Sequence, residues 1–146
     1  MKVLCISSSG GHWIQLQRIF TKLNFSDVRI CSTYNHIEDD FSGFKYYQVT
    51  DFSRDDLYKI AKVFTEVVSI ERNFSPDLII TTGAAPGLVA CLFWSILRRK
   101  TIWVDSIANS EKVSMSGRIA KYFCSEVLTQ WKHLESGKVR YVGRIL

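Results

Sequence analysis

The chain has 146 residues, 47% of them hydrophobic and 23% charged, which excludes a disordered protein and suits one domain with a real core. Since domains typically run to about 100–150 residues, an activity that needs two domains would need a second chain. The net charge of +5 is uneven, because residues 98–146 hold ten basic and four acidic residues, whereas residues 1–97 hold nine and ten. A basic region of this kind attracts nucleic acid, anionic lipid headgroups or diphosphates, unless it is only a soluble basic surface.

The first half of the chain alternates predicted strands with predicted helices. Residues 2–6 form a short apolar run that predicts a buried strand, and apolar residues at helical spacing predict a helix over 13–23. Further strands are predicted at 28–31 and 44–49. A long amphipathic helix is predicted from about 55 to 73, with Ser53 as its N-cap. Its expected buried face consists of Leu57, Ile60, Ala61, Phe64, Val67 and Val68.

The second half continues the alternation. Strands are predicted at 78–81, 102–105, 127–129 and 139–142, and helices at 87–97 and about 116–123. Alternating strands and helices predict an α/β fold, a Rossmann-like parallel sheet with helices on both faces. A 3-2-1-4-5 strand order would make the first and fourth strands neighbours. Ligands of such sheets bind at the carboxyl ends of the strands, so the loops that follow the strands are the candidate sites.

Residues 78–97 allow two interpretations, because these twenty residues carry no charge and are long enough to span a bilayer. A turn-forming stretch at 81–87 interrupts the run, however, and a strand, a glycine loop and an apolar helix explain it equally well. The helix would be apolar nearly all round, with Phe93 and Trp94 adjacent. It would therefore lie in the core, against a partner or partly against lipid.

The first candidate loop runs from Ser7 to His12 and contains Ser9, Gly10 and Gly11. Its glycines allow close backbone approach to a ligand, and the N-terminus of the next helix offers free N–H groups to an anion. His12 would act as a general base or donate a hydrogen bond to a phosphate, unless it is incidental to a tight turn. Neither a G-x-G-x-x-G motif nor a Walker Gly-Lys-Ser/Thr occurs in the sequence, which argues against dinucleotide and P-loop nucleotide binding.

Three more loops fall at the same predicted edge of the sheet. Taken singly, the second is equally well explained as a compact turn, and isolated Asp, Gln and Trp residues such as those of the third and fourth are usually structural. The information therefore lies in the shared position of the loops. The second loop offers small and hydroxyl side chains, the third offers carboxylates and hydroxyls, and the fourth offers an amide and an indole. Their candidate binding residues are Thr82, Gly83, Pro86 and Gly87, then Asp105 and Ser106, then Gln130 and Trp131.

The four cysteines, Cys5, Cys31, Cys91 and Cys124, are widely spaced, without a C-x-x-C motif or a Cys/His cluster. This pattern predicts reduced, buried cysteines in a cytoplasmic protein, and no metal site. The apolar stretch that begins the chain is too short for a signal peptide.

Taken together, four motifs resemble the Alg14 family, which includes bacterial PssD- and CpsF-like exopolysaccharide proteins. The motifs occur in the family's order and cover essentially the whole chain. They are Ser-Ser-Gly-Gly-His, Thr-Thr-Gly-x-x-Pro-Gly, Asp-Ser-Ile-Ala followed by Ser-x-Ser-Gly-Arg-x-x-Lys-Tyr, and Gln-Trp.

This resemblance implies that residues 1–146 form the N-terminal, acceptor-binding domain of a GT-B glycosyltransferase, related in form to MurG-type enzymes. The chain would bind a polyprenyl-diphosphate-linked sugar, in exopolysaccharide or lipid-linked oligosaccharide synthesis. An Alg13-, PssE- or CpsG-like partner would hold the UDP-sugar, so this chain would be inactive or weakly active alone. His12, or as second choice Asp105, would lie nearest the acceptor hydroxyl. No metal or other cofactor, and no nucleic acid, is implied.

Membrane attachment is a point of departure from the family pattern. Eukaryotic members begin with a membrane-spanning helix, and none is expected here. Peripheral attachment at the cytoplasmic face would instead come from the apolar helix around Phe93 and Trp94, the basic C-terminal third or the partner. The alternative function is a stand-alone Rossmann-like binding module or enzyme for a phosphorylated soluble ligand, which would be expected to hide its apolar helix.

Overall fold

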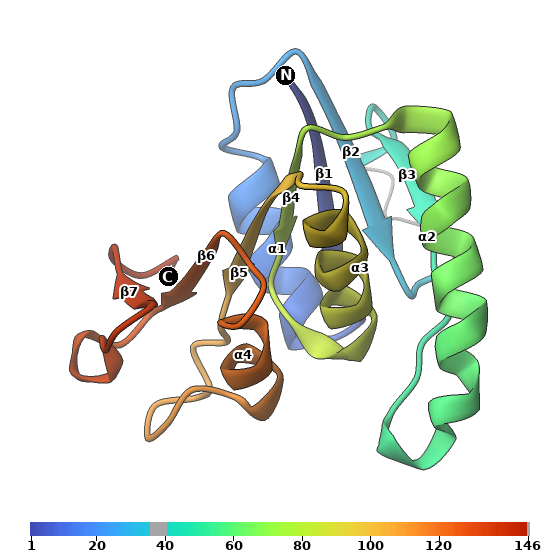
Figure 1. The fold of residues 1–146 in the computed structure, drawn as a ribbon. Helices are drawn as coiled ribbons and strands as arrows, with labels where there is room; N and C mark the ends of the chain where they lie inside the picture. The colour runs from blue at the N-terminus through green and yellow to red at the C-terminus, as the bar shows by residue number, and fades with distance from the viewer. Residues whose placement is uncertain (36–40, 146) are drawn as a thin grey trace.

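A computed structural model describes residues 1–35 and 41–145 of the chain. Within these ranges, seven parallel strands form one sheet in the order β3-β2-β1-β4-β5-β6-β7 (Figure 1). The predicted adjacency of the first and fourth strands is confirmed, because β1 pairs with β4 from Val3–Leu78 to Ile6–Thr81. The strands are β1 (Lys2–Ser7), β2 (Asp27–Ser32), β3 (Lys45–Gln48), β4 (Leu78–Thr81), β5 (Lys100–Val104), β6 (Glu126–Thr129) and β7 (Val139–Tyr141).

Helices cover both faces of the sheet, as the alternating pattern predicts. Figure 1 shows α1 on one face and α2 and α3 on the other, and α4 packs beside α3. The α-helices are α1 (Gly11–Phe20), α2 (Ile60–Phe74), α3 (Ala84–Ile96) and α4 (Met115–Ala120), and the 3-10 helices are η2 (Arg54–Lys59) and η3 (Lys132–Leu134).

Two apolar cores result from the period-two alternation of the central strands. On β1, Val3 and Cys5 face the core formed with α1, whereas Leu4 and Ile6 face the core formed with α2, α3 and α4. All four cysteines are free, and all four are buried, as predicted. Burial raises the pKa of the Cys5 thiol to about 12, so this thiol stays protonated at neutral pH.

The long helix predicted over 55–73 is instead divided in two. Ser53 caps the start as predicted, in a capping box with Asp56, but the backbone kinks at Asp56 and the α-helix begins only at Ile60. The predicted buried face is wrong for its first half: Leu57, Ile60, Ala61 and Phe64 are exposed. The residues of α2 that enter the core are Val63, Val67, Ile70 and Phe74.

Residues 78–97 are divided between β4 and α3, so the strand, loop and helix interpretation is correct. None of the helices in the described part of the chain is both long and apolar enough to cross a bilayer. Helix α3 begins at Ala84, three residues earlier than predicted, and Pro86 lies in its first turn, where no intrahelical N–H bond is lost.

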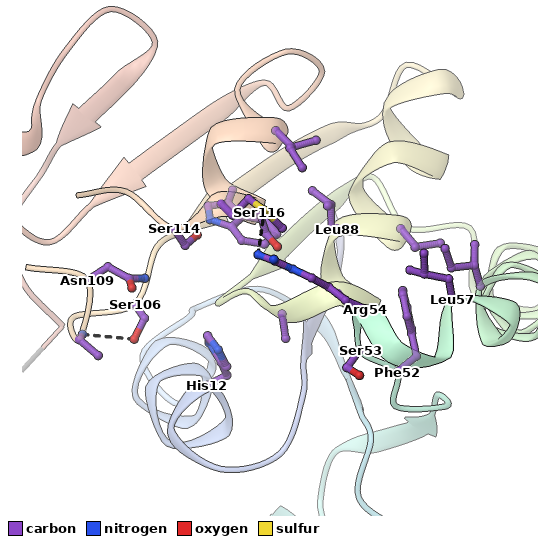
Figure 2. A pocket seen from close by; sticks show the side chains of 18 residues that line it. His12, Phe52, Ser53, Arg54, Leu57, Leu88, Ser106, Asn109, Ser114 and Ser116 are labelled. Atoms are coloured by element: carbon purple, nitrogen blue, oxygen red, sulfur yellow. Dashed lines mark hydrogen bonds between the residues drawn. The ribbon is translucent and has the colours of Figure 1, made fainter. Parts of the chain in front are cut away.

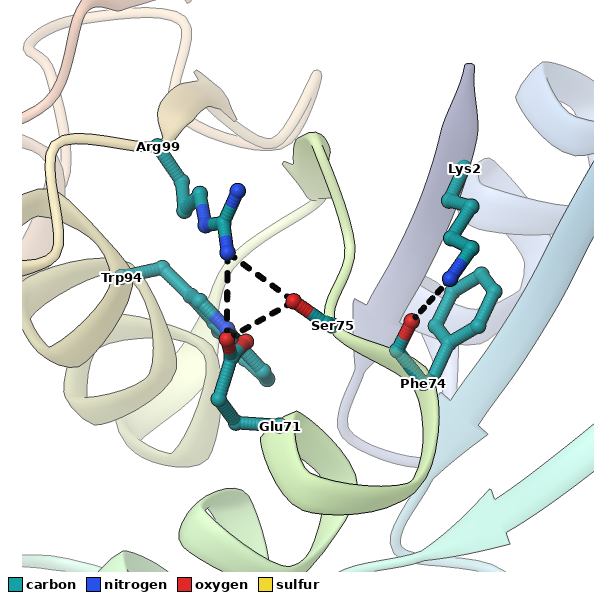
Figure 3. A network of polar contacts seen from close by, with 6 residues as sticks. All are labelled: Lys2, Glu71, Phe74, Ser75, Trp94 and Arg99. Carbon is teal, nitrogen blue, oxygen red and sulfur yellow. Dashed lines mark hydrogen bonds and ion pairs between the residues drawn. The ribbon is translucent and has the colours of Figure 1, made fainter.

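Trp94 belongs to the core rather than to a surface. Its side chain is fully buried and donates from Nε1 to Glu71 Oε2 at 2.7 Å (Figure 3). Arg99 Nη2 and Ser75 Oγ contact the other carboxylate oxygen of Glu71 at 3.2 and 3.0 Å, which ties the end of α2 to the end of α3. A membrane contact of the helix around Phe93 and Trp94 therefore cannot involve Trp94, although Leu92 and Ile96 of α3 are exposed.

Candidate functional site

The first two glycine loops meet at the carboxyl edge of the sheet, because they follow the adjacent strands β1 and β4. His12 and Thr82 join them through two reciprocal contacts: His12 Nδ1 lies 2.7 Å from the carbonyl oxygen of Thr82, and Thr82 Oγ1 donates to the carbonyl oxygen of His12 at 2.7 Å. The two loops therefore form one wall of the site.

The contact with Thr82 fixes the protonation pattern of His12. A carbonyl oxygen can only accept, so Nδ1 must carry the proton that it shares with Thr82. In the neutral imidazole, Nε2 then has the free lone pair. The His12 side chain lines the neighbouring cleft, so a basic nitrogen is available in a position where a ligand hydroxyl could reach it (Figure 2).

Two of the loop glycines adopt backbone conformations that side chains rarely allow. Gly10 has φ of 75° and Gly83 has φ of 119°. A Cβ on Gly83 would also lie 3.0 Å from His12 Cε1, so this glycine makes room for the imidazole ring. These two residues precede α1 and α3, and neither helix has a side-chain cap in the described part of the chain. Ser9 precedes Gly10, and its backbone N–H donates to Thr33 Oγ1 at 2.9 Å.

Pro86 and Gly87 lie beneath the loop rather than in the cleft. Both are buried in the first turns of α3. A Cβ on Gly87 would overlap the Thr81 hydroxyl, and that hydroxyl accepts a hydrogen bond from the backbone N–H of Gly83 at 3.1 Å. Gly87 therefore lets α3 pack closely against β4 and thereby sets the position of the second loop.

Asp105 is only 2% exposed, and its carboxylate is surrounded by donors from β5 and from the loop that follows it. It accepts from the backbone N–H and the hydroxyl of Ser114 at 2.8 and 2.5 Å, from Asn109 Nδ2 at 3.2 Å and from Trp103 Nε1 at 3.1 Å. These contacts close the loop between β5 and α4. They leave Ser106, rather than Asp105, lining the cleft.

Gln130 and Trp131 also serve as connections between segments. Gln130 Nε2 donates to Gln15 Oε1 at 2.7 Å, and Gln15 Nε2 donates to Ser106 Oγ at 3.0 Å. Trp131 Nε1 donates to the carbonyl oxygen of Ile107 at 2.8 Å. Neither Gln130 nor Trp131 lines the cleft beside His12. Gln15, a buried polar residue of α1 that sequence reasoning missed, links the fourth loop to the third.

The cleft has a volume of about 620 Å³, and its lining is polar in one part and apolar in another. His12, Ser106, Asn109 and Ser114 supply polar groups near the strand ends. The apolar part is lined by Leu57, Ile60, Leu88, Val89, Met115 and Ile119.

Arg54 is the one Lys or Arg among the described residues that line the cleft, and sequence reasoning missed it. Its guanidinium reaches across the cleft, with Nη2 2.9 Å from Met115 Sδ (Figure 2). The only feature of the sequence that drew attention to this position was that Arg54 directly follows Ser53, the predicted N-cap. In residues 1–35 and 41–145, no group of three or more His, Cys, Asp or Glu side chains could hold a metal ion.

Solved structures with a similar fold include MurG from Acinetobacter baumannii, with a TM-score of 0.76 and 12% identity over 97% of this chain and 45% of that chain. The UDP-GlcNAc 2-epimerase from Methanocaldococcus jannaschii matches with a TM-score of 0.71 and 16% identity, over 99% of this chain and 46% of that one. At such identities the likeness concerns the fold alone. It confirms the predicted Rossmann-like, GT-B-type architecture.

Sequence relatives identify the family. The chain is 30% identical over 104 residues to the "UDP-N-acetylglucosamine transferase subunit ALG14" of Eremothecium gossypii, which covers 64% of this chain and 46% of that protein. Identity to the Rattus norvegicus protein of the same name is 32% over 101 residues, 60% of this chain and 47% of that protein. The chain thus spans about half the length of these curated relatives. A family model described as "Oligosaccharide biosynthesis protein Alg14 like" matches residues 57–145, and the chain therefore belongs to the Alg14-like family.

Proposed function

We propose that this chain is the acceptor-binding subunit of a two-chain, UDP-sugar-dependent glycosyltransferase. The acceptor is a polyprenyl diphosphate carrying one sugar, and the partner is an Alg13-, PssE- or CpsG-like chain that holds the UDP-sugar and is recruited by this one. Membership of the Alg14-like family supports this proposal, as does the correspondence of the whole chain to about half of MurG.

The observation that carries the proposal is the two-part cleft. A lipid-linked sugar needs polar contacts for the sugar, a cation for the diphosphate and apolar contacts for the first isoprene units. The cleft offers the hydroxyl, amide and imidazole groups near the strand ends, Arg54 across its width and apolar side chains of η2, α3 and α4 beyond. We therefore place the sugar near His12, the diphosphate near Arg54 and the lipid over Leu57 and Ile119.

In the proposed reaction, His12 Nε2 accepts the proton of the acceptor hydroxyl as the hydroxyl oxygen attacks the anomeric carbon of the donor sugar. The new glycosidic bond forms as the bond from the anomeric carbon to UDP breaks, and UDP leaves with the electron pair. Attack opposite the leaving group inverts the anomeric configuration. Asp105 is the second choice for the base, and its four donors support a role in positioning Ser106 and Ser114 instead.

The alternative, a stand-alone protein for a phosphorylated soluble ligand, would be expected to hide the apolar side chains of its helices. Leu57 of η2, Phe64 of α2 and Ile96 of α3 are exposed instead, and the exposed fraction of Ile96 reaches 70%. This exposure favours a subunit that works against a partner and at a membrane surface. We further propose peripheral attachment at the cytoplasmic face, which a wash with high salt or alkaline carbonate should largely release.

Reconstitution tests the proposal. The purified chain and its nucleotide-sugar-binding partner, each alone and then mixed, are incubated with a labelled UDP-sugar and a polyprenyl-diphosphate-linked sugar. We expect transfer to the lipid only from the mixture. Full turnover by this chain alone would refute the split-enzyme proposal and favour a stand-alone enzyme.

A further inference from the structure

A second hollow, of about 510 Å³, lies beside α4 and is lined by Arg118 and Lys121, which follow the cleft-lining residues Met115 and Ser116 along the chain. Helix α4 and the turn after it therefore form a wall shared by the cleft and this second hollow. The other lining residues come from the loop before α4 and from the segment that leads into β7.

The charges of this second hollow have nearly one sign. Lys112, Arg118, Lys121 and Lys138 line it together with one carboxylate, that of Glu111. They come from three separate segments of the chain, so the fold brings the cations together. The lining thus carries a net charge of +3, while the cleft beside His12 has one Arg and no carboxylate among its described lining residues.

Protein carboxylates do not neutralise these cations. In the described part of the chain, none of the four forms an ion pair within 4.0 Å. The carboxylate of Glu126 on β6 pairs with Lys100 and Arg140 instead. With Glu111 as the one carboxylate in the lining, the excess positive charges repel one another, and a bound anion relieves that repulsion.

Two apolar side chains of this shared wall are exposed: Tyr122, which lines the hollow, and Ile119, which lines the adjoining cleft. Tyr122 is 76% exposed and Ile119 is 43% exposed, and the ammonium of Lys121 lies 5.3 Å from the centroid of the Tyr122 ring. Aromatic and aliphatic side chains flanked by Lys and Arg are typical of segments that lie at the interface of a membrane. A soluble anion would gain nothing from Tyr122 or Ile119, whereas a phospholipid would contact them with its glycerol and acyl regions.

We propose that the hollow beside α4 binds the phosphate of an anionic phospholipid headgroup, with Tyr122 and Ile119 entering the interface. This inference rests on the proposed function in one respect, that the chain works at a membrane. The surface that contacts the membrane is then α4 with the residues around it, and not the helix surface at Trp94, which is buried. The hollow and the cleft share α4. A phospholipid bound in the hollow would therefore hold the mouth of the cleft at the membrane surface, where the diphosphate of a polyprenyl lipid leaves the bilayer.

Sedimentation of the full chain with vesicles tests the proposal. Vesicles contain phosphatidylcholine alone or with about one third phosphatidylglycerol. The variant Arg118→Gln/Lys121→Gln removes two cations of the hollow, and Lys45→Gln/Arg72→Gln removes two exposed cations elsewhere with the same change in net charge. Each basic residue close to an anionic surface is worth about fivefold in affinity. The first variant should therefore bind the anionic vesicles about twenty-five-fold more weakly, and the second within about twofold of the unmodified chain.

Equal losses in both variants would mean that net charge alone attracts the chain, and would overturn the proposal. Unchanged binding of the Arg118→Gln/Lys121→Gln variant would overturn it as well. Tyr122→Ser adds a check on insertion, because it leaves every charge in place and should still weaken binding severalfold. All variants alter exposed or half-buried side chains, and circular dichroism verifies that they fold.

Calorimetric titration with inorganic phosphate separates the lipid from a soluble ligand. We expect at most millimolar affinity, since free phosphate lacks the apolar contacts. Micromolar phosphate affinity that depends on Arg118 and Lys121, without an effect of the variant on vesicle binding, would make the hollow a soluble phosphate site and refute the lipid assignment. The vesicle assay needs neither partner nor sugar donor, so its failure would leave the transferase proposal standing.

Discussion

Replacing His12 separates two roles that its imidazole combines. Nδ1 donates to the Thr82 carbonyl, and Nε2 is the atom that we propose as the base. In His12→Asn, the amide nitrogen occupies nearly the position of Nδ1, so the contact with Thr82 can persist while the base is lost. His12→Ala removes both groups. The bond from Thr82 Oγ1 to the backbone carbonyl of residue 12 survives in every variant, so the loops should stay together.

The magnitudes follow from these two roles. Loss of a general base lowers turnover by about 10²-fold or more, equivalent to about 2.7 kcal/mol of transition-state stabilisation. Loss of the hydrogen bond to Thr82 costs about 1 kcal/mol of folding stability. We therefore expect both variants to lose at least about 10²-fold in turnover, and only His12→Ala to lose that stability.

The assay is turnover of the reconstituted pair at saturating acceptor, with thermal denaturation of each variant in parallel. If His12→Asn retains turnover near that of the unmodified chain while His12→Ala does not, His12 only clamps the second loop. If both variants retain turnover, His12 has no part in catalysis.

Three predictions concern the structure that supports the site. Gly87→Ala should destabilise the fold by about 1–2 kcal/mol, because its Cβ would overlap the Thr81 hydroxyl, whereas Gly11→Ala, with nothing within 4 Å of the new Cβ, should be nearly neutral in chemical denaturation. Ile70→Ala should cost about 2–5 kcal/mol and Ile60→Ala less than about 1 kcal/mol, since the two isoleucines of α2 are 3% and 38% exposed; equal losses would contradict the observed burial of this helix. Asp105→Asn should lower the melting temperature by several degrees, because hydrogen bonds to a charged group contribute about 1.5–3 kcal/mol each; a fully stable variant that had lost turnover would instead make Asp105 the base.

The sequence predicted the elements and their order well, because the alternation of strands and helices leaves few topologies open. The meeting of His12 with Thr82 was predictable in outline, since their loops follow strands that are neighbours in a 3-2-1-4-5 sheet. The contact between Nδ1 and a carbonyl oxygen was not, because it depends on the φ values of Gly10 and Gly83.

Burial was harder to predict than secondary structure. The pattern of α2 contains two adjacent apolar stripes, and only packing decides that Val63 and Ile70 enter the core while Ile60 stays exposed. The sequence around Asp105 likewise did not predict that its carboxylate would be buried among donors, because one of them, Ser114, lies nine residues further along the chain. Arg54 lines the cleft through a contact with Met115, 61 residues further along the chain, which no periodicity reveals.

The central claim is that this chain holds the acceptor and its partner holds the donor. Calorimetric titration of the purified chain with a short polyprenyl diphosphate carrying one sugar, and separately with a UDP-sugar, tests that claim most directly. We predict that the acceptor analogue binds, that Arg54→Gln weakens its binding about tenfold, and that the UDP-sugar binds weakly or not at all. Micromolar binding of the UDP-sugar, with no binding of the lipid-linked sugar, would contradict the proposed division of labour.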